Sequence, residues 1–278
     1  MARADPAAPA LAHLEMDLLL EALYQRFGHD FRAYERAALE RRLRVLMDER
    51  GLATISALQE QLLHAPGVEQ ELLRALALAP AGLFEDPAFA RDLRRVLAAS
   101  LRACALPKIW LPECTGAAEA WALAIVLAEQ KLDARTAIFA TVANDSLLQE
   151  MRDASVPVAS LAQWQDLYLQ GGGTGELARF FDCTGECARL RADLRERITW
   201  FQSSLVTDAS FNEFQVIICR RALPDFGPAL RQRVLGLFHD SLARFGLLAL
   251  DRQLAPADAH AGSYQAIGTE QHWYKRVA

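Results

Sequence analysis

The chain lacks several features that define large classes of proteins. Charges or prolines interrupt every leucine-rich stretch, so no apolar run reaches the roughly 18–20 residues that a membrane span requires. Residues 1–10 lack the apolar core of a secretory signal and are expected to form a disordered tail. With 35 acidic and 30 basic residues, the net charge of −5 gives no general attraction to nucleic acid or anionic lipid. We expect a cytoplasmic protein without membrane insertion and without a nucleic-acid ligand.

Cysteine and histidine are scarce, and their spacing excludes the common disulfide and metal frameworks. The five cysteines form an odd and scattered set, so reduced thiols are expected. Cys183 and Cys187 form a close pair without a second pair at zinc-ligand spacing, and Gly185 between them predicts a hairpin turn. The six histidines show no ligand spacing. The nucleophile-elbow motif of hydrolases and the phosphate-loop motif of nucleotide-binding proteins are absent. The zinc-binding motif His-Glu-x-x-His is absent as well, so the sequence predicts no metal site.

The composition is that of an ordinary globular protein with a sizeable core. The 278 residues are 52% hydrophobic and 23% charged, which suggests one large or two modest domains. Over 11–86, leucines recur at spacings of three and four and predict an all-helical domain. The predicted helices run from 11 to 27, from 34 to 50, from a cap at Thr54 or Ser56 to 64, and from 68 to 78. Asp86 and Pro87 then predict the start of a linker helix within 87–107.

From residue 108 onward, short apolar runs alternate with helical ones, which is typical of βαβ units. The predicted strands are 108–111, 137–142, 198–203, 214–219 and 247–250, and the predicted helices are 117–131, 146–153 and 228–242. A stretch at about 163–197 breaks the alternation and predicts a small inserted β subdomain, with 171–173 as a flexible glycine joint. A final edge strand is predicted at 273–277. The expected fold class is α/β, a doubly wound Rossmann-like domain over 108–278 preceded by the all-α domain.

Five short segments carry a resemblance to a known family. They are 30–34 with 41–44, 83–87, 119–125, 139–141, and 205–208 with 214–220. In this order, from about Leu14 to Val277, they resemble the CheR-type chemoreceptor glutamate methyltransferases, which use S-adenosylmethionine. The resemblance implies a helical N-terminal domain, a linker, and a doubly wound methyltransferase domain with a small antiparallel subdomain. The hydrophobic periodicities indicate the same layout.

The chain departs from this family at the cofactor positions. The family's glycine-rich turn aligns with 113–119, so Glu113 occupies a glycine position and Gly116 is a glycine in a new place, while Glu119 is kept. A side chain and a negative charge at 113 would repel the cofactor's carboxylate. The resemblance places the remaining exchanged positions at Val142 for the ribose acid, Ser204 for the adenine-reading asparagine, and Arg221 for the asparagine after Arg220. Asn144 or Asp145 is the alternative acceptor for the ribose.

The residues to which the resemblance assigns methyl transfer are also replaced. Ala81 stands for a threonine, Glu85 for the linker arginine and Asp225 for a tyrosine, so these catalytic positions are degenerate. The arginine-to-glutamate exchange reverses the charge where a substrate carboxylate would be held. We therefore expect decayed cofactor and catalytic motifs in a non-catalytic binding or regulatory module of a chemotaxis-like signalling pathway, with no cofactor.

Two alternatives stay open. One is an active protein-glutamate O-methyltransferase that binds S-adenosylmethionine through rearranged contacts. The other is a cleft retuned to a different nucleotide-like ligand, in which Arg220 and Arg221 hold a phosphate near Gly116.

A basic helix at 34–50 is the candidate surface for a protein partner. In the family, this helix faces the methylation region of the substrate protein, so the resemblance implies that Arg41, Arg42 and Arg44 contact an acidic helical surface. Helix geometry places Arg41 and Arg44 on one face and rotates Arg42 by about 100°. The alternative is a solvated face on which the arginines pair with acids of the same helix region, at positions 35, 40 and 49.

Overall fold

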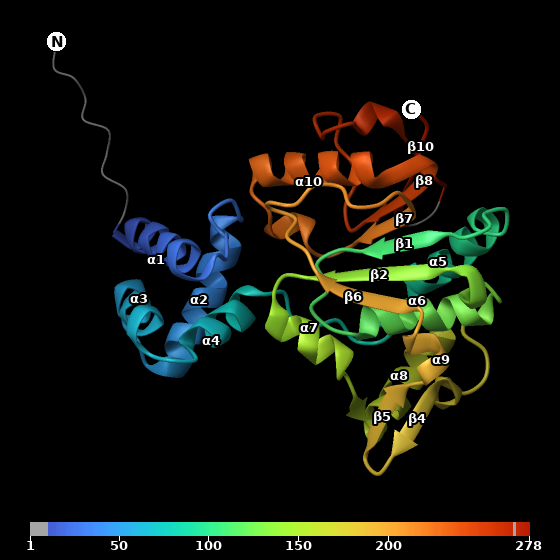
Figure 1. Cartoon of the computed structure of the whole chain (residues 1–278), viewed down its shortest axis with the longest axis horizontal. Helices are drawn as coiled ribbons and strands as arrows, with labels where there is room; N and C mark the ends of the chain where they lie inside the picture. Colours follow the sequence, from blue (N-terminus) through green and yellow to red (C-terminus); the bar gives the residue numbers. More distant parts are fainter. Residues whose placement is uncertain (1–10, 269–270) are drawn as a thin grey trace. The chain divides into compact units, whose positions relative to one another are not determined.

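The computed structural model describes residues 11–268 and 271–278, and the tail expected at 1–10 lies outside them. The chain divides into two compact units (Figure 1). The first unit extends to Leu78 and includes Pro224–Leu230, and the second holds Ala79–Leu223 and Arg231–Ala278. The first unit thus ends before the expected boundary at 86, because the linker packs with the second unit: Pro80 lies directly against Gly116.

The first unit is built from helices around a leucine core. Its helices are α1 (Leu11–Phe27), α2 (Arg36–Arg50), α3 (Ile55–His64) and α4 (Val68–Leu76). Buried leucines from all of them form one cluster, as the spacing predicts. Gly51 ends α2 in the left-handed conformation with φ 65°, and the Thr54 side chain caps α3 by accepting from the amide of Ala57 at 3.1 Å.

The second unit is built on a mixed sheet with strand order β6-β2-β1-β7-β8-β10-β9. The strands are β1 (Lys108–Leu111), β2 (Ala137–Val142), β6 (Ile198–Gln202), β7 (Phe214–Cys219), β8 (Leu242–Leu250), β9 (Tyr264–Ala266) and β10 (His272–Arg276). Pairing is parallel from β6 to β8 and antiparallel through β10 and β9. The strand predicted at the carboxyl end is present as β10, but it is not the edge of the sheet, because the three-residue β9 pairs with its outer side.

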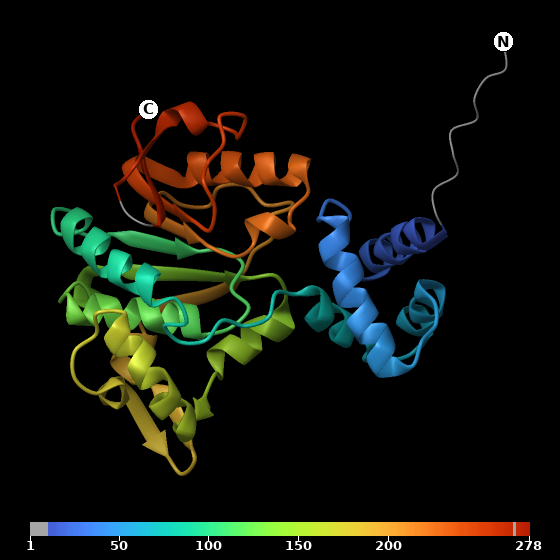
Figure 2. The same ribbon diagram turned by 180° about the vertical axis from the view of Figure 1, so that it is seen from behind.

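Helices pack on both faces of this sheet. They are α5 (Pro87–Ser100), α6 (Ala118–Glu129), α7 (Asp145–Arg152) and α10 (Pro228–Ser241), with short 3₁₀ turns at Asp133–Arg135, Leu177–Phe180, Leu223–Asp225 and Ala261–Ser263. In β1, Ile109 packs into the cluster that contains α5 and α6, whereas the Trp110 ring meets Phe238 of α10 at 5.5 Å. Successive strand side chains point to opposite faces, so α6 and α10 cover different sides. In Figure 2, which views the molecule from behind, the teal helix α5 lies in front of the sheet, on the face that is turned away in Figure 1.

The inserted subdomain consists of β3 (Val156–Pro157), α8 (Val158–Gln170), β4 (Phe181–Thr184), β5 (Cys187–Leu190) and α9 (Ala192–Arg195). Its strands pair antiparallel in the order β3-β5-β4. Gly185 turns the hairpin with φ 60°. Cys183 pairs with Ala188 and Cys187 with Thr184, so the two free thiols point to opposite faces of the hairpin.

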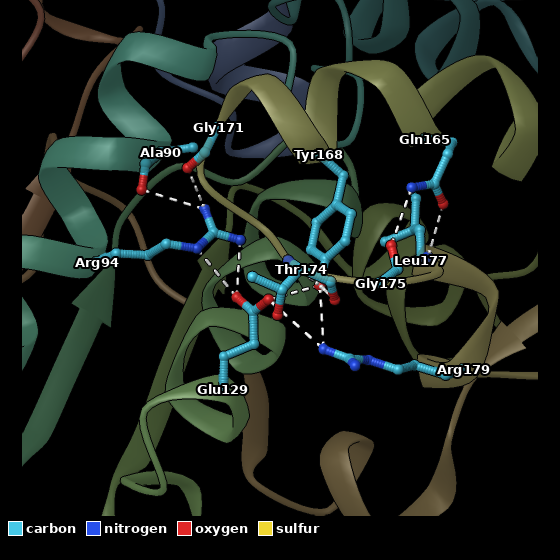
Figure 3. Close-up of polar contacts among 10 residues, drawn as sticks. All are labelled: Ala90, Arg94, Glu129, Gln165, Tyr168, Gly171, Thr174, Gly175, Leu177 and Arg179. Carbon is cyan, nitrogen blue, oxygen red and sulfur yellow. Dashed lines mark hydrogen bonds and ion pairs between the residues drawn. The ribbon is translucent and has the colours of Figure 1, made fainter.

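The glycine run at 171–173 is not a flexible joint, because it packs against a buried polar network (Figure 3). Arg94 of α5 donates to the Glu129 carboxylate at 2.7 Å and to the Gly171 carbonyl at 2.7 Å. The Tyr168 hydroxyl donates to Glu129 at 2.5 Å. A Cβ on Gly173 would lie 2.2 Å from the Tyr168 ring. Close packing, rather than mobility, requires glycine here. This network joins α5, α6 and α8.

Among helices formed by residues 11–268 and 271–278, none has the length and apolar composition to cross a membrane.

Candidate functional site

A cavity of about 200 Å³ opens at the carboxyl ends of β1 and β7, where α/β sheets bind their ligands. Its walls come from the linker, the first turns of α5 and α6, and the residues that follow both strands. Its polar lining residues are Glu85, Asp86, Glu113, Glu119, Arg220 and Arg221. Five of these six positions, together with Ala81, were expected from the sequence. Asp86 was expected only as a helix cap.

Glu113 occupies the turn between β1 and α6 in a conformation that glycine adopts easily. Its φ is 55°, a left-handed conformation that residues with a side chain adopt only at a cost. The half-buried side chain makes no hydrogen bond or ion pair within the described residues. Burial raises the pKa of the Glu113 carboxyl to about 7. The turn therefore carries an uncompensated acid inside the cavity.

Gly116 serves the packing of the linker. A Cβ at this position would lie 2.9 Å from the Cβ of Pro80, and the Thr115 hydroxyl donates to the Ala79 carbonyl at 3.5 Å. Gly116 does not line the cavity. In the alternative of a phosphate held by Arg220 and Arg221, Gly116 would therefore not contact the ligand, because the linker covers it.

The end of β2 presents no free acceptor for ribose hydroxyls. Val142 is fully buried, and its carbonyl accepts from the Ser203 amide at 3.1 Å. The Asn144 side chain caps α7 by accepting from the Leu147 amide at 3.0 Å. Asp145 is exposed in the first turn of α7. Neither residue at 144–145, the alternative acceptors for the ribose, is among the residues that line the cavity.

Ser204 belongs to a local turn outside the cavity. Its amide donates to the Asp208 carboxylate at 2.9 Å, and its hydroxyl accepts from the Val206 amide at 3.3 Å. A side chain held in this way has little freedom to read a base. The position that the resemblance assigns to adenine recognition is thus occupied by a turn-forming residue.

The two arginines after β7 differ in their surroundings. Arg220 donates to the Asp86 carboxylate at 2.8 Å, and its guanidinium lies 3.9 Å from the centre of the Phe89 ring. Arg221, by contrast, makes no side-chain hydrogen bond or ion pair within the described residues; its Nη1 atom is buried without a partner, as is the Nε atom of Arg220. Burial raises the pKa of the nearby Glu119 carboxyl, although Arg221 acts in the opposite direction. Arg220 therefore supports the fold, and Arg221 has hydrogen-bonding capacity left for a ligand.

Two of the positions to which the resemblance assigns methyl transfer, Glu85 and Asp225, make local structural contacts. The exposed Glu85 carboxylate accepts from the Gly82 amide at 2.7 Å and so closes the linker turn. Asp225 belongs to the first unit, where its buried carboxylate pairs with Arg42. Asp225 does not line the cavity. Its pairing has no local sequence signal, since the two partners are 183 positions apart.

The arginines of α2 separate into two groups. Arg42 donates to the Leu76 carbonyl at 2.9 Å and to Asp225, so its guanidinium is unavailable, and its assignment to the partner surface is wrong. Arg36 pairs with Asp17, and Arg50 pairs with Glu71. Arg41 and Arg44 are exposed and form no ion pair within the part of the chain that the structure describes.

The acids near these two arginines do not neutralise them. Glu40 lies 3.5 Å from His13, and no ion pair joins Glu35, Glu40 or Glu49 to Arg41 or Arg44 within residues 11–268 and 271–278. These glutamates therefore form no close ion pair with the two arginines, whose side chains are exposed to solvent.

Comparisons with known proteins match both parts of the chain. The all-alpha domain of CheR methyltransferases matches residues 14–77, and the SAM-binding domain of CheR methyltransferases matches residues 83–253. The chain belongs to the CheR methyltransferase family. The family and the fold class expected from the sequence are thereby confirmed.

Three individual proteins resemble the chain to different degrees. A putative methyltransferase Cher3 of Pseudomonas putida is 31% identical over 264 residues, which cover 95% of this chain and 97% of that protein. An uncharacterised 104.1 kDa protein of Rhodobacter capsulatus is 24% identical over 229 residues, and the match spans 80% of this chain but only 23% of that protein. The glycopeptide N-methyltransferase MtfA in complex with S-adenosylmethionine is 17% identical, with a TM-score of 0.34 over 61% of this chain and 56% of that one. The latter likeness is too remote to inform the site.

Within the described residues, no group of three or more His, Cys, Asp and Glu side chains is arranged to hold a metal ion.

Proposed function

We propose that this CheR-family protein is a non-catalytic binding or regulatory module of a signalling pathway, with a cleft that does not hold S-adenosylmethionine. The observation that carries the proposal is Glu113. Its left-handed backbone holds an acid without a cationic partner in the turn that the cofactor's amino-acid carboxylate would approach. Bringing two carboxylates together in a half-buried site is costly unless a cation joins them.

The other half of the cofactor site supports the same proposal. The cavity is walled by the β1 turn and the residues after β7, and Val142, Asn144 and Ser204 are not among its lining residues. Binding of an adenosine would need acceptors at the end of β2, and the buried Val142 side chain supplies none. A site built to pair hydroxyls loses much of its affinity without the acceptor.

The charge near the transfer position also disfavours catalysis. Methyl transfer depends mainly on positioning and on a favourable electric field. Glu85 lines the cavity where the resemblance expects a cation, and its carboxylate is tied to the linker through Gly82. A substrate carboxylate would meet a negative charge at this position.

Titration calorimetry with S-adenosylmethionine and S-adenosylhomocysteine tests the proposal. We expect no heat of binding with either compound. Val142→Asp alone should not create binding, because one hydrogen bond to a charged group, worth about 1.5–3 kcal/mol, does not offset the misplaced Glu113 charge. Micromolar binding of either compound by the unmodified protein contradicts the proposal. Tight binding of either compound by Val142→Asp alone would show that Glu113 and its turn do not prevent binding.

The proposed module binds an acidic helical protein surface through Arg41 and Arg44. Both are exposed, neither has an ion-pair partner within the described residues, and Val45 beside them is 55% exposed. Contacts between exposed charges act mainly through the association rate and are screened over about 8–10 Å at physiological ionic strength. Binding should therefore weaken as salt is added.

A helical peptide with glutamates three and four residues apart is a suitable probe for this surface. We expect Arg41→Glu/Arg44→Glu to abolish its binding, while the matched reversal Arg102→Glu/Arg197→Glu, at exposed arginines of the second unit, leaves it unchanged. Affinity that changes neither with salt nor with the first pair of reversals rules out this surface.

A cleft retuned to another ligand is the second candidate function. The buried Nη1 atom of Arg221 without a partner favours an anionic group in the cavity. Arg220 is already engaged by Asp86, so two free arginines for a nucleotide phosphate are not available.

A further inference from the structure

A groove between α6, α7, α9 and β6 lies apart from the cavity described above. Its volume of about 300 Å³ is at the lower end of the about 300–1,000 Å³ that ligand pockets occupy. The walls meet because α9 packs against α6 and α7 packs against the edge strand β6 (Figure 1). The groove and the cavity share no lining residue, so the groove is a separate place for a ligand.

The floor and one wall of the groove are apolar and aromatic. Trp121 of α6, Met151 of α7 and Ile198 of β6 line the groove and are buried. Trp200 lies two residues after Ile198 on the same side of β6, and it is only partly buried. A partly buried indole offers its ring to a flat ligand, because aromatic rings stack on one another.

The rim of the groove carries two arginines that no acid neutralises. Arg195 at the end of α9 makes no side-chain hydrogen bond or ion pair within the described part of the chain, and its Nε atom is buried without a partner. The Arg152 guanidinium at the end of α7 makes only a long contact, 3.5 Å from its Nη2 atom to the Trp200 carbonyl oxygen. Glu196, the acid among the lining residues, is exposed and pairs with neither arginine. Both guanidinium groups can therefore donate to an anion.

The arginines and the indoles together select the ligand. A buried donor without a partner occurs at several arginines of the chain and does not by itself indicate a site. In this groove, such a donor lies with a second guanidinium group and two indoles. Guanidinium groups bind carboxylate and phosphate oxygens through paired hydrogen bonds, and indoles stack on flat rings. An anion without a ring would leave the indoles uncovered, and a neutral ring would leave the arginines without an anion.

We propose that this groove binds a small anion that carries a flat aromatic ring, with the ring against Trp200 and the anionic group held by Arg195 and Arg152. A nucleoside monophosphate and an aromatic carboxylic acid share this chemistry. The bound ligand joins α9 of the inserted subdomain to α7 and to the edge of the main sheet. The inference does not depend on the proposed function, because the groove and the cavity beside β1 are separate.

Calorimetry and tryptophan fluorescence on the full chain test the inference, with AMP, UMP and indole-3-acetate as probes. Adenosine, uridine and indole-3-acetamide are the matched compounds without the anionic group, and inorganic phosphate is an anion without a ring. We expect at least one of the three probes to bind. Its uncharged counterpart should bind at least about tenfold more weakly, because it loses the charge-assisted hydrogen bonds. Binding of AMP or UMP alone supports a phosphate ligand, and binding of indole-3-acetate alone supports a carboxylate.

Variants locate the site. Arg195→Gln and Trp200→Ala should each weaken binding at least about fivefold, because one removes a donor and the other removes the stacking surface. Trp200→Phe should bind more tightly than Trp200→Ala, since a phenyl ring still stacks, and its fluorescence should change less when the ligand binds. Arg197→Gln at an exposed position and Trp164→Phe at a partly buried position of α8 are the matched controls outside the groove, and both should leave the affinity unchanged.

Three results would overturn the inference. It is wrong if none of the probes binds at millimolar concentration, or if the uncharged counterparts bind as well as the probes. It is also wrong if Arg221→Gln abolishes binding and Arg195→Gln does not, because the ligand then lies in the cavity beside β1. Should a groove variant fail to fold, the comparison of charged and uncharged compounds on the unmodified protein still decides the question. S-adenosylmethionine and S-adenosylhomocysteine carry no net negative charge, so their binding tests the proposed function alone.

Discussion

Replacing Glu113 by glutamine should stabilise the protein at pH 8 and leave its stability unchanged at pH 4.5. Burial raises the pKa of this carboxyl from 4.5 to about 7, so the folded state holds the proton more tightly than the unfolded state. Such a group destabilises the fold when it is ionised. The cost is absent below pH 4.5, grows as the pH rises to about 7, and is fully present above that pH. Glutamine carries no charge at any pH, so the variant does not have this free-energy cost.

The magnitude follows from the shift. A tenfold change in proton affinity is worth about 1.4 kcal/mol, so a rise from 4.5 to about 7 gives at most about 3.4 kcal/mol. Glu113 is only half-buried, and screening by solvent reduces this to about 1–2 kcal/mol. For a domain of this size, each kcal/mol moves the unfolding temperature by about 2–4 °C. Glu113→Gln should therefore raise it by about 2–8 °C at pH 8.

Thermal unfolding of the protein and the variant at pH 8 and pH 4.5 measures how the effect of the substitution on the unfolding temperature changes with pH. Other titrating groups are common to both proteins, so their contributions cancel. Glu113→Gly separates strain from charge, because release from the left-handed conformation should add about 1 kcal/mol at either pH. Glu196→Gln, at an exposed acid, is the matched control. A gain for Glu113→Gln that is equal at both pH values, or larger at pH 4.5, refutes the reasoning.

Three further substitutions test the packing. Glu129→Ala removes the carboxylate that the Arg94 guanidinium and the Tyr168 hydroxyl share, and leaves them, as donors, only their bonds to backbone carbonyls. Because a buried charge loses its ion-pair partner, the free energy of unfolding should fall by about 3–5 kcal/mol in urea titrations, and a loss below about 1 kcal/mol contradicts the network. Gly173→Ala should destabilise by about 1–3 kcal/mol or more in thermal unfolding, whereas Gly236→Ala, with open space around it, should be neutral or stabilising by up to about 1 kcal/mol; equal effects contradict the packing argument. Thr54→Ala should cost about 1 kcal/mol of the same free energy, and Ser56→Ala should cost less, because only the first caps α3.

Elements that bury a continuous apolar pattern could be predicted from the sequence. The strands at 137–142 and 214–219 were predicted to the residue, because central parallel strands are apolar throughout and end at polar turns. The three-residue β9 leaves no such pattern, which is why β10 was mistaken for an edge. The glycines at 171–173 indicate mobility by composition, and only the position of the Tyr168 ring reveals that they are packed.

Residues of the candidate site could be predicted from the sequence only where they lie beside a strand end or a helix start that the sequence pattern itself predicts. Glu85, Glu113 and Arg221 follow that rule, because each lies next to a strand end or helix start that the pattern predicts. Asp225 breaks it, since its ion pair with Arg42 joins distant parts of the chain. Pairings of this kind depend on tertiary packing and have no signal in local sequence.

Plain loss of function does not account for all of the replaced positions. Most of them have acquired a local structural role: Glu85 closes the linker turn, Gly116 admits Pro80, and Asp225 neutralises Arg42. Each of these residues forms a local hydrogen bond, packing contact or ion pair, and such contacts are enough to explain why the residue is tolerated. Glu113 and Arg221 differ, because one combines a left-handed backbone with an uncompensated acid and the other keeps a buried donor without a partner. Backbone strain of this kind costs on the order of 1–3 kcal/mol and clusters at functional sites, whereas buried donors without a partner also occur away from the cavity, at Arg189, Arg195 and Arg252. Both residues line one cavity, which supports the second candidate function, a cleft that binds another ligand.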